Sequence, residues 1–337
     1  MEPTELLRTE NVTRWFPTGG GFIRKASSFM KAVDGVSLDV RRGETLGLVG
    51  ESGCGKTTLG RTVMRLTEAT GGKIIFEGKD VTNAKGGQLK ALRRKMQMVF
   101  QDPYASLDPR QSIQSALLEP MKIHRVARTK KEAYLLAQEL IEKVGLNPDH
   151  LSRFPHEFSG GQRQRIAVAI ALAVKPNLII LDEPTSSLDV SVQAQILRLL
   201  KSLQSDLGLT YIFISHNLAV IRQMCNRTAV MYLGRIVEIA DTNRIFENPK
   251  HPYTKALLSS VPIPDPSKRK EFQLLKGDVP SPIAIPSGCR FRTRCKYATA
   301  KCEQIAPPLI EIEKNHWIEC HYDIDFLKVG AGISGSL

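Results

Sequence analysis

The chain has 337 residues, 42% of them apolar and 24% charged, so it can bury a substantial core, and we expect it to divide into two domains. Its longest apolar run, Ile166 to Val174, is far shorter than the roughly 20 residues that a membrane-spanning helix needs, so any membrane role has to come from partners. The net charge of +13 favours an anionic partner, but the basic residues are dispersed in short groups, which is typical of a solvated face and argues against nucleic acid.

The N-terminal segment, Met1 to Trp15, is mixed and acidic, so we expect neither a secretory signal nor a membrane anchor. Without such a signal, the six cysteines argue against a disulfide framework, because the cytosol keeps thiols reduced. Metal or cluster ligation is therefore the sharper interpretation of these cysteines.

In chain order, the first 40 residues and residues 71–80 read as short strands, which we expect to be antiparallel. Between them, Thr45 to Val49 forms an apolar strand, glycines at positions 50, 53 and 55 turn the chain, and a helix is predicted to begin near Lys56. The sequence therefore predicts a strand, loop and helix unit.

That loop, Gly50-Glu51-Ser52-Gly53-Cys54-Gly55-Lys56-Thr57, matches the phosphate-binding pattern G-x-x-x-x-G-K-[ST] in the setting that the pattern requires. Glycines let successive N–H groups converge on phosphate oxygens, and the helix N-terminus adds the positive end of its dipole. We expect Lys56 to reach the β- and γ-phosphates and Thr57 to ligate magnesium. The predicted nucleotide-binding residues here are Gly50, Ser52, Gly53, Cys54, Gly55, Lys56, Thr57 and Thr58.

Residues of about 105–172 have a helical pattern and are predicted to form a helical insert. Lys130 to Val144 carries apolar residues at helix spacing, and Gly145 follows as a C-cap signal.

A second buried strand, Leu178 to Leu181, ends in two acids. We expect Asp182 to hold magnesium, through water, and Glu183 to act as the general base that orients the attacking water. A solvated turn is the alternative for paired acids, but it fits poorly with the apolar residues immediately before them.

A third strand, Tyr211 to Ile214, ends at Ser215-His216. Ligands of open parallel sheets bind outside the carboxyl ends of the strands, so the three strand ends are predicted to face one crevice. His216 could touch the γ-phosphate there, although a lone histidine is more often structural.

Proline density rises after residue 248, which marks the end of the first domain. We therefore expect an ATPase domain over residues 1–247 and an extension over residues 248–337 whose fold does not rest on regular elements.

The extension contains four cysteines within a short window, at positions Cys289, Cys295, Cys302 and Cys320. Zinc sites commonly show a two-to-four-residue gap between ligands, which is absent here, so a four-iron cluster is favoured over structural zinc. Four buried thiols without a metal are the alternative. His316 or His321 could replace one ligand.

Phe158-Ser159-Gly160-Gly161-Gln162 resembles the signature stretch of the ABC-transporter ATPases, usually written with Leu first. The other elements of that family follow in order: Gln101 in Phe100-Gln101-Asp102, Ser187-Leu188-Asp189, and His216. The resemblance covers roughly residues 5–245 and implies an α/β fold with a RecA-like P-loop core, an antiparallel β subdomain and a helical subdomain over about 105–172.

The resemblance also implies that two cassettes pair head to tail, with each ATP between the phosphate loop of one and the signature of the other. The signature residues are Ser159, Gly160, Gly161 and Gln162, and Asp189 joins the set. Gln101 is implied as a magnesium ligand that links the γ-phosphate to the membrane partner, beside Thr57 and Asp182. The implied catalytic residues are Glu183, His216, Lys56 and Gln101.

An aromatic near the N-terminus stacks on adenine in this family, and Phe16 matches its place best, with Trp15 as the second choice. Either residue could instead belong to the core.

The extension resembles the tail of ATPases from dipeptide and oligopeptide importers, a tail shared with nickel importers. The resemblance rests on Asn248-Pro249, His251-Pro252-Tyr253-Thr254 and Pro286 to Phe291. Members often carry a cysteine set of this spacing that is associated with a [4Fe-4S] cluster, for which a structural staple is the modest hypothesis.

The two resemblances together imply an ATP-hydrolysing subunit of a peptide importer, with Mg2+, on the cytoplasmic face of the inner membrane. Its implied partners are a second ABC ATPase in a heterodimer, two transmembrane permease subunits and an extracytoplasmic substrate-binding protein, with no nucleic acid. The alternatives are a nickel or other small-solute importer, and a soluble ABC ATPase that does not act in transport.

Overall fold

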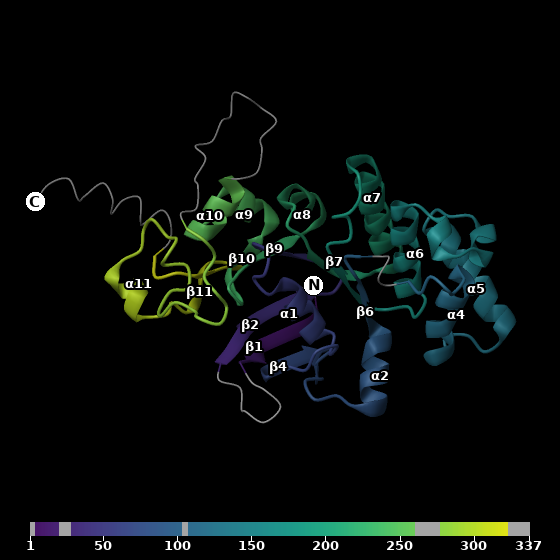
Figure 1. The fold of residues 1–337 in the computed structure, drawn as a ribbon, viewed down its shortest axis with the longest axis horizontal. Coiled ribbons are helices and arrows are strands. Elements are labelled where there is room, and N and C mark those ends of the chain that lie inside the picture. The colour runs from purple at the N-terminus through teal and green to yellow at the C-terminus, as the bar shows by residue number, and fades with distance from the viewer. Residues whose placement is uncertain (1–3, 20–27, 103–106, 260–276, 323–337) are drawn as a thin grey trace, which may run out of the picture.

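The computed structural model describes residues 4–19, 28–102, 107–259 and 277–322. Figure 1 shows an elongated molecule, with a strand-rich centre, a helical lobe at one end and a small C-terminal lobe at the other. Among the described residues, no helix combines the length and apolarity that crossing a bilayer requires.

The centre is an eight-stranded sheet in the order β11-β12-β10-β9-β3-β8-β7-β6. Its parallel part is β3, β6, β7, β8 and β9, and β10, β12 and β11 continue it with antiparallel pairing. The parallel strands are Thr45–Val49 (β3), Met96–Val99 (β6), Leu178–Asp182 (β7), Thr210–Ile214 (β8) and Arg227–Tyr232 (β9). The three strands predicted from apolar runs are confirmed.

Both faces of the central strands are covered, which explains why their sequences read as continuous apolar runs. Alternate residues of β3, β7 and β8 enter two different cores. One core includes α1 (Lys56–Val63) and the smaller sheet, and the other includes α6 (Gly160–Leu172), α7 (Val190–Leu207) and α8 (Leu218–Met224). The loop between β3 and α1 therefore lies between the two cores, with Val49 in one and Cys54 in the other.

The smaller sheet has the order β2-β1-β4-β5 and is antiparallel, as expected. Its strands are Glu5–Thr18 (β1), Ser28–Arg41 (β2), Gly71–Phe76 (β4) and Lys79–Asp80 (β5). The prediction that the first strands are short was wrong, because β1 and β2 have 14 residues each. Register shifts between them absorb the irregular spacing of their apolar residues.

The helical insert is confirmed within the described residues. It contains α4 (Ile113–Ile123), α5 (Lys130–Lys143), 3-10 turns at Pro148–Ser152 and Pro155–Glu157, and then α6. Helix α5 begins where Thr129 accepts a hydrogen bond from the Glu132 N–H, and Gly145 follows its end at φ 74°. Residues 103–106, at the predicted start of the insert, lie outside the described residues.

The expectation that the extension lacks regular elements was wrong. After α9 (Thr242–Glu247) it contains α10 (Pro252–Ser259), α11 (Ala300–Gln304), β11 (Leu309–Glu313) and β12 (His316–Glu319). Strand β12 pairs with β10 (Arg235–Asp241), so the extension continues the central sheet. The fully buried Glu238 carboxylate accepts hydrogen bonds from the Lys250 and His251 N–H groups and lies 2.7 Å from His316 Nε2.

Candidate functional site

The loop between β3 and α1 is held in a shape that only glycine permits at position 55. Gly55 has φ 108°, and a Cβ atom there would lie 2.0 Å from the Ala32 carbonyl oxygen of β2. The loop is therefore pressed against the smaller sheet at the point where helix α1 begins. Its following N–H groups stand at a helix N-terminus, which is a favourable position for phosphate.

The Lys56 ammonium lies inside this loop. Its Nζ donates to the Gly50 carbonyl at 2.8 Å and to the Glu51 carbonyl at 3.0 Å, and the side chain is buried. These neutral carbonyls do not cancel its charge. The ammonium therefore keeps its charge inside the loop, and its contact with the β- and γ-phosphates stays a prediction.

Thr57 and Asp182 meet at the foot of the loop. Thr57 Oγ1 donates to Asp182 Oδ1 at 2.9 Å, and Asp182 is 2% exposed. Burial raises the pKa of the Asp182 carboxyl, and the charge of Glu183 adds to this effect. A hydroxyl and a buried carboxylate at the end of a strand are oxygen ligands that suit Mg2+, so the residues fit the predicted metal.

Glu183 is the meeting point of two other predicted residues. Its Oε2 atom accepts a hydrogen bond from Gln101 Nε2 at 3.0 Å and lies 3.2 Å from His216 Nδ1. Glu183 has φ 48°, a strained left-handed conformation that proteins retain mainly at functional sites. The structure thus brings Gln101, Glu183 and His216 together beside Asp182.

The predicted signature residues begin helix α6. Ser159 and Gln162 form a capping box: the Gln162 N–H donates to Ser159 Oγ at 3.4 Å, and the Ser159 N–H donates to Gln162 Oε1 at 3.0 Å. Figure 1 shows α6 with the helical lobe, apart from α1. The structure therefore does not place this stretch in the phosphate loop of its own chain.

Asp189 lies next to the signature. Its Oδ1 accepts the Val192 N–H at 3.0 Å and the Ser191 hydroxyl at 2.7 Å, which begins helix α7 and lowers the pKa of the Asp189 carboxyl. A Cβ on Gly161 would lie 2.3 Å from Val192 Cγ1, so the two helix starts are in contact and glycine is required between them.

The two candidate adenine-stacking aromatics lie at the end of β1. The Trp15 Nε1 donates to Asp34 Oδ1 at 2.9 Å and Lys31 Nζ lies 4.7 Å from its ring, while the Arg14 guanidinium lies 4.4 Å from the Phe16 ring. Both rings are partly exposed, so neither belongs to the core. The choice of Phe16 over Trp15 stays a prediction.

The four cysteines of the extension gather in one lobe, which we call the cysteine lobe (residues 277–322). Burial raises the pKa of Cys289 to about 11 and that of Cys320 to about 12; the charges of Cys302 and Cys295 add to the rise at Cys289, and those of Cys289, Cys295 and Cys302 to the rise at Cys320. The Cys289 N–H donates to the Cys302 carbonyl at 2.7 Å. In the described ranges, however, no three His, Cys, Asp or Glu side chains stand close enough to hold a metal ion.

The two histidines named as substitute ligands are engaged elsewhere. His316 Nε2 lies 2.7 Å from Glu238 Oε1, and His321 Nε2 lies 2.8 Å from the Ile305 carbonyl. The structure thus gives neither histidine a role at the cysteines.

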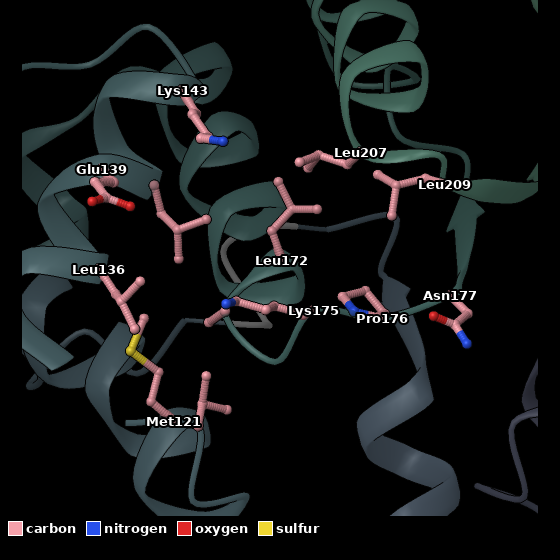
Figure 2. Close-up of a pocket in the computed structure, with 13 residues that line it drawn as sticks. Met121, Leu136, Glu139, Lys143, Leu172, Lys175, Pro176, Asn177, Leu207 and Leu209 are labelled. Carbon is pink, nitrogen blue, oxygen red and sulfur yellow. The ribbon is translucent and has the colours of Figure 1, made fainter. Parts of the chain in front are cut away.

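A groove between the helical lobe and the central sheet was not predicted. Its apolar half is a hollow of about 480 Å3, and Figure 2 shows Met121, Leu136, Leu172, Leu207 and Leu209 around it. The adjoining half, about 570 Å3, shares Lys175 and Asn177 with the first and has no acidic residue in its lining. Its cations are Lys90, Arg94, Lys95, Arg125 and Lys175. We call the two halves together the lobe groove.

Three contact residues of the phosphate loop were missed by the sequence analysis. Glu51 was treated as a variable position of the motif, while Tyr253 and Arg294 lie in the extension and contact it. No sequence signal linked them, because the partners are 202 and 243 positions apart.

Comparison with known families agrees with this geometry. Residues 33–186 match the family described as ABC transporter, and residues 237–302 match the oligopeptide/dipeptide transporter C-terminal region.

Curated relatives cover nearly the whole chain. A putative oligopeptide transport ATP-binding protein of Bacillus subtilis, YkfD, is 53% identical over 87% of this chain and 89% of its own. A putative peptide import ATP-binding protein of Brucella ovis is 49% identical, covering 96% and 99%. The oligopeptide transport ATP-binding protein AppF of Bacillus subtilis is 47% identical, covering 94% and 97%.

Solved structures show the same fold. A dimeric ATP-binding cassette bound to ADP and Pi in a post-hydrolysis state has a TM-score of 0.63 and 27% identity, covering 70% of this chain and 99% of its own. The cbiO1 protein of Clostridium perfringens, part of an ABC transporter complex, has a TM-score of 0.61 and 25% identity, covering 72% and 91%. The fold is that of an ABC ATPase cassette.

The contact between α6 and α7 yields a stability prediction. Gly161→Ala should destabilise the full chain by about 1–3 kcal/mol, because valine is stiff and cannot move away from the new methyl group. Gly160→Ala is the matched control, since its Cβ would meet nothing closer than 3.4 Å. Urea unfolding of both variants gives the comparison, and adding Val192→Ala should restore most of the loss. Equal midpoints for the two glycine variants would refute the packing argument.

Proposed function

The chain belongs to the ABC transporter ATP-binding family, and we propose how its residues divide the work of that family. It is the ATP-hydrolysing subunit of a peptide importer. The single observation that carries the residue roles is the convergence of Gln101 and His216 on one oxygen of Glu183, beside the Thr57 and Asp182 pair. We also propose that the chain divides into an ATPase domain over residues 1–247 and an extension over residues 248–337.

The N–H groups of the loop and the Lys56 ammonium bind the phosphates, and Thr57, Asp182 and Gln101 are the residues that would hold Mg2+. Bound Mg2+ neutralises charge on the phosphates. Glu183 accepts a proton from the attacking water, and Gln101 and His216 hold its carboxylate in position. His216 is 61% exposed in the single chain, so the site becomes closed to solvent only when something covers it.

We propose that the cover is a second ABC ATPase, whose signature faces this phosphate loop while Ser159 to Gln162 face the loop of the second subunit. Ser159 is exposed at the start of helix α6, where the positive end of the helix dipole favours an anion, which supports such a contact. A heterodimer, two permease subunits, an extracytoplasmic binding protein and a place on the cytoplasmic membrane face complete the proposal.

The catalytic role of Glu183 gives a direct prediction. Glu183→Gln should lower steady-state ATP hydrolysis by a factor of at least about 100, because the amide no longer accepts the proton, while nucleotide binding is kept. Lys56→Ala should instead weaken nucleotide binding itself. Phosphate release and equilibrium binding of an ATP analogue separate the two effects. Turnover of the Glu183 variant near that of the unmodified chain would contradict the assignment.

The lobe groove is where we propose that a permease subunit docks, through a cytoplasmic helical segment with apolar side chains and an acidic one. Charge complementarity supports this partner, because the basic half has no acidic residue in its lining and the field of Lys90 and Arg94 adds to burial in lowering the pKa of His124. Helix α2 (Gly86–Lys95), in the groove wall, leads directly through β6 to Gln101. A displacement of α2 on docking would therefore move Gln101, which contacts Glu183.

Charge reversal tests the docking site. Lys90→Glu combined with Arg94→Glu should abolish co-purification with the permease subunits in detergent, because two attractive contacts become repulsive, while nucleotide binding by the chain is kept. The control is Arg198→Glu with Lys201→Glu, two exposed cations on α7 outside the groove. Permease assembly that survives the first pair would contradict the proposal.

We propose that the cysteine lobe holds a [4Fe-4S] cluster through Cys289, Cys295, Cys302 and Cys320. Its support is that the thiols of this lobe lie in one electrostatic neighbourhood, since the charges of Cys289, Cys295 and Cys302 all act on Cys320. Tetrahedral zinc would need sulfur atoms about 3.8 Å apart, from its Zn–S bonds of about 2.3 Å, whereas a cluster spreads one thiolate onto each of four irons. A cluster bound by these four cysteines would cross-link the cysteine lobe and stabilise its fold.

Metal analysis of protein purified without oxygen tests the cluster. We expect iron, acid-labile sulfide and broad visible absorbance, all lost in Cys302→Ser and kept in Cys225→Ser, a buried cysteine outside the lobe. The serine keeps the size of the side chain but is a poor ligand for iron. Zinc without iron, or iron that survives Cys302→Ser, would reverse the assignment.

A further inference from the structure

Glu51, the second residue of the phosphate loop, is held on three sides. Its carbonyl accepts from Lys56 Nζ at 3.0 Å, its N–H donates to the Tyr253 hydroxyl at 2.9 Å, and its carboxylate pairs with Arg294. Only the first of these partners belongs to the loop. The other two come from the C-terminal extension.

The Arg294 contact has the geometry of a strong ion pair. Its two terminal nitrogens reach the two Glu51 oxygens at 2.6 and 3.0 Å, as a bidentate fork. The Arg294 side chain is 6% exposed and that of Glu51 25%, so solvent screens the pair little. A fork of this kind fixes both the position and the orientation of the carboxylate.

The extension reaches the same loop by a second route. Arg290 donates to the Leu233 carbonyl and pairs with Asp34, which also accepts from Trp15. The next residue after Leu233, Gly234, donates its N–H to the Cys54 carbonyl in the loop at 2.9 Å. The segment from Cys289 to Cys295 thus supports the phosphate loop at both Glu51 and Cys54.

Aromatic packing makes this support rigid. The Phe291 ring lies between Arg290 and Arg294 in the chain and contacts Tyr232 at 5.3 Å, Tyr253 at 5.4 Å and His251 at 5.8 Å between centroids. Tyr253 is fully buried, so its hydroxyl is held against the Glu51 N–H by packing rather than by chance.

Nucleotide binding changes which contacts hold the phosphate loop. When Lys56 turns to the phosphates, the Gly50 carbonyl loses its Lys56 donor and the Glu51 carbonyl keeps only the Cys54 N–H, at 3.3 Å, so the first half of the loop is held less firmly from inside. The contacts from Tyr253 and Arg294 do not involve Lys56 and can persist in the bound state. They then hold the loop open to the phosphates in the shape that its N–H groups need.

We propose that Arg294, with Tyr253, is a positioning residue for ATP: the extension fixes Glu51 and so keeps the phosphate loop preorganised for its ligand. The inference rests on the proposed nucleotide site. It makes the extension part of the ATP site, whichever group the cysteines hold.

The test measures binding of a nonhydrolysable ATP analogue with Mg2+ to the full chain, by calorimetry. Arg294→Ala should raise Kd about tenfold, since a charge-assisted fork is lost, and Tyr253→Phe should raise it less. Arg294→Lys should restore part of the affinity, because it keeps the charge but not the fork. In the assembled transporter, KM for ATP should rise while kcat stays within about twofold, since Arg294 does not touch the reacting atoms.

The control is Arg292→Ala, in the same segment, whose contacts run to Ser287 and Glu303 away from the loop. It should leave Kd unchanged. An equal rise in Kd for Arg292→Ala and Arg294→Ala would overturn the inference, because it would indicate that the whole lobe is loosened. Unchanged binding in a folded Arg294→Ala chain would also overturn it. If Lys56→Ala loses nucleotide binding while Arg294→Ala keeps it, the inference fails and the proposed function stands. If the unmodified chain binds no nucleotide, the inference and the proposed function both fail.

Discussion

The structure depends on the close approach of the β3–α1 loop to strand β2, where Gly55 leaves no room for a side chain beside the Ala32 carbonyl. This contact fixes where helix α1 begins, and with it the direction of the N–H groups that face a phosphate. The parallel strands then set the remaining chemistry, since β7 ends at Asp182 and β8 leads to His216. Because the carboxyl ends of these neighbouring strands share one edge, Asp182 meets Thr57 there and His216 meets Glu183.

Those parts were predictable because their signals are local. A buried parallel strand reads as an apolar run, and a phosphate loop has glycines at fixed offsets. The extension lacked such signals. Strands β11 and β12 are short and partly polar, and β12 is held by pairing with β10 and by the buried contacts of His316 with Glu238 and of Glu319 with Arg235 rather than by a periodic apolar face. The basic residues of α2 are exposed, as the sequence predicted, but that they line a groove depends on where α4 ends beside them and has no signal in the sequence.

The extension is therefore more than a tail added to an ATPase cassette. It supplies strands to the central sheet, an aromatic cluster around Phe291 and two arginines that support the phosphate loop. The contacts of Tyr253 and Arg294 with Glu51 join residues 202 and 243 positions apart and cannot be read from spacing. They also give a physical reason for four cysteines in this place, since whatever fixes Cys289 and Cys295 also fixes the arginines between them.

A crystal structure of the full chain with Mg2+ and a nonhydrolysable ATP analogue tests the central claim most directly. The account predicts phosphate oxygens on the N–H groups of residues 52–58, with Lys56 Nζ moved from the Gly50 and Glu51 carbonyls onto the phosphates and the Glu51–Arg294 pair intact. A loop without nucleotide, with Lys56 still on those carbonyls at saturating analogue, would contradict it.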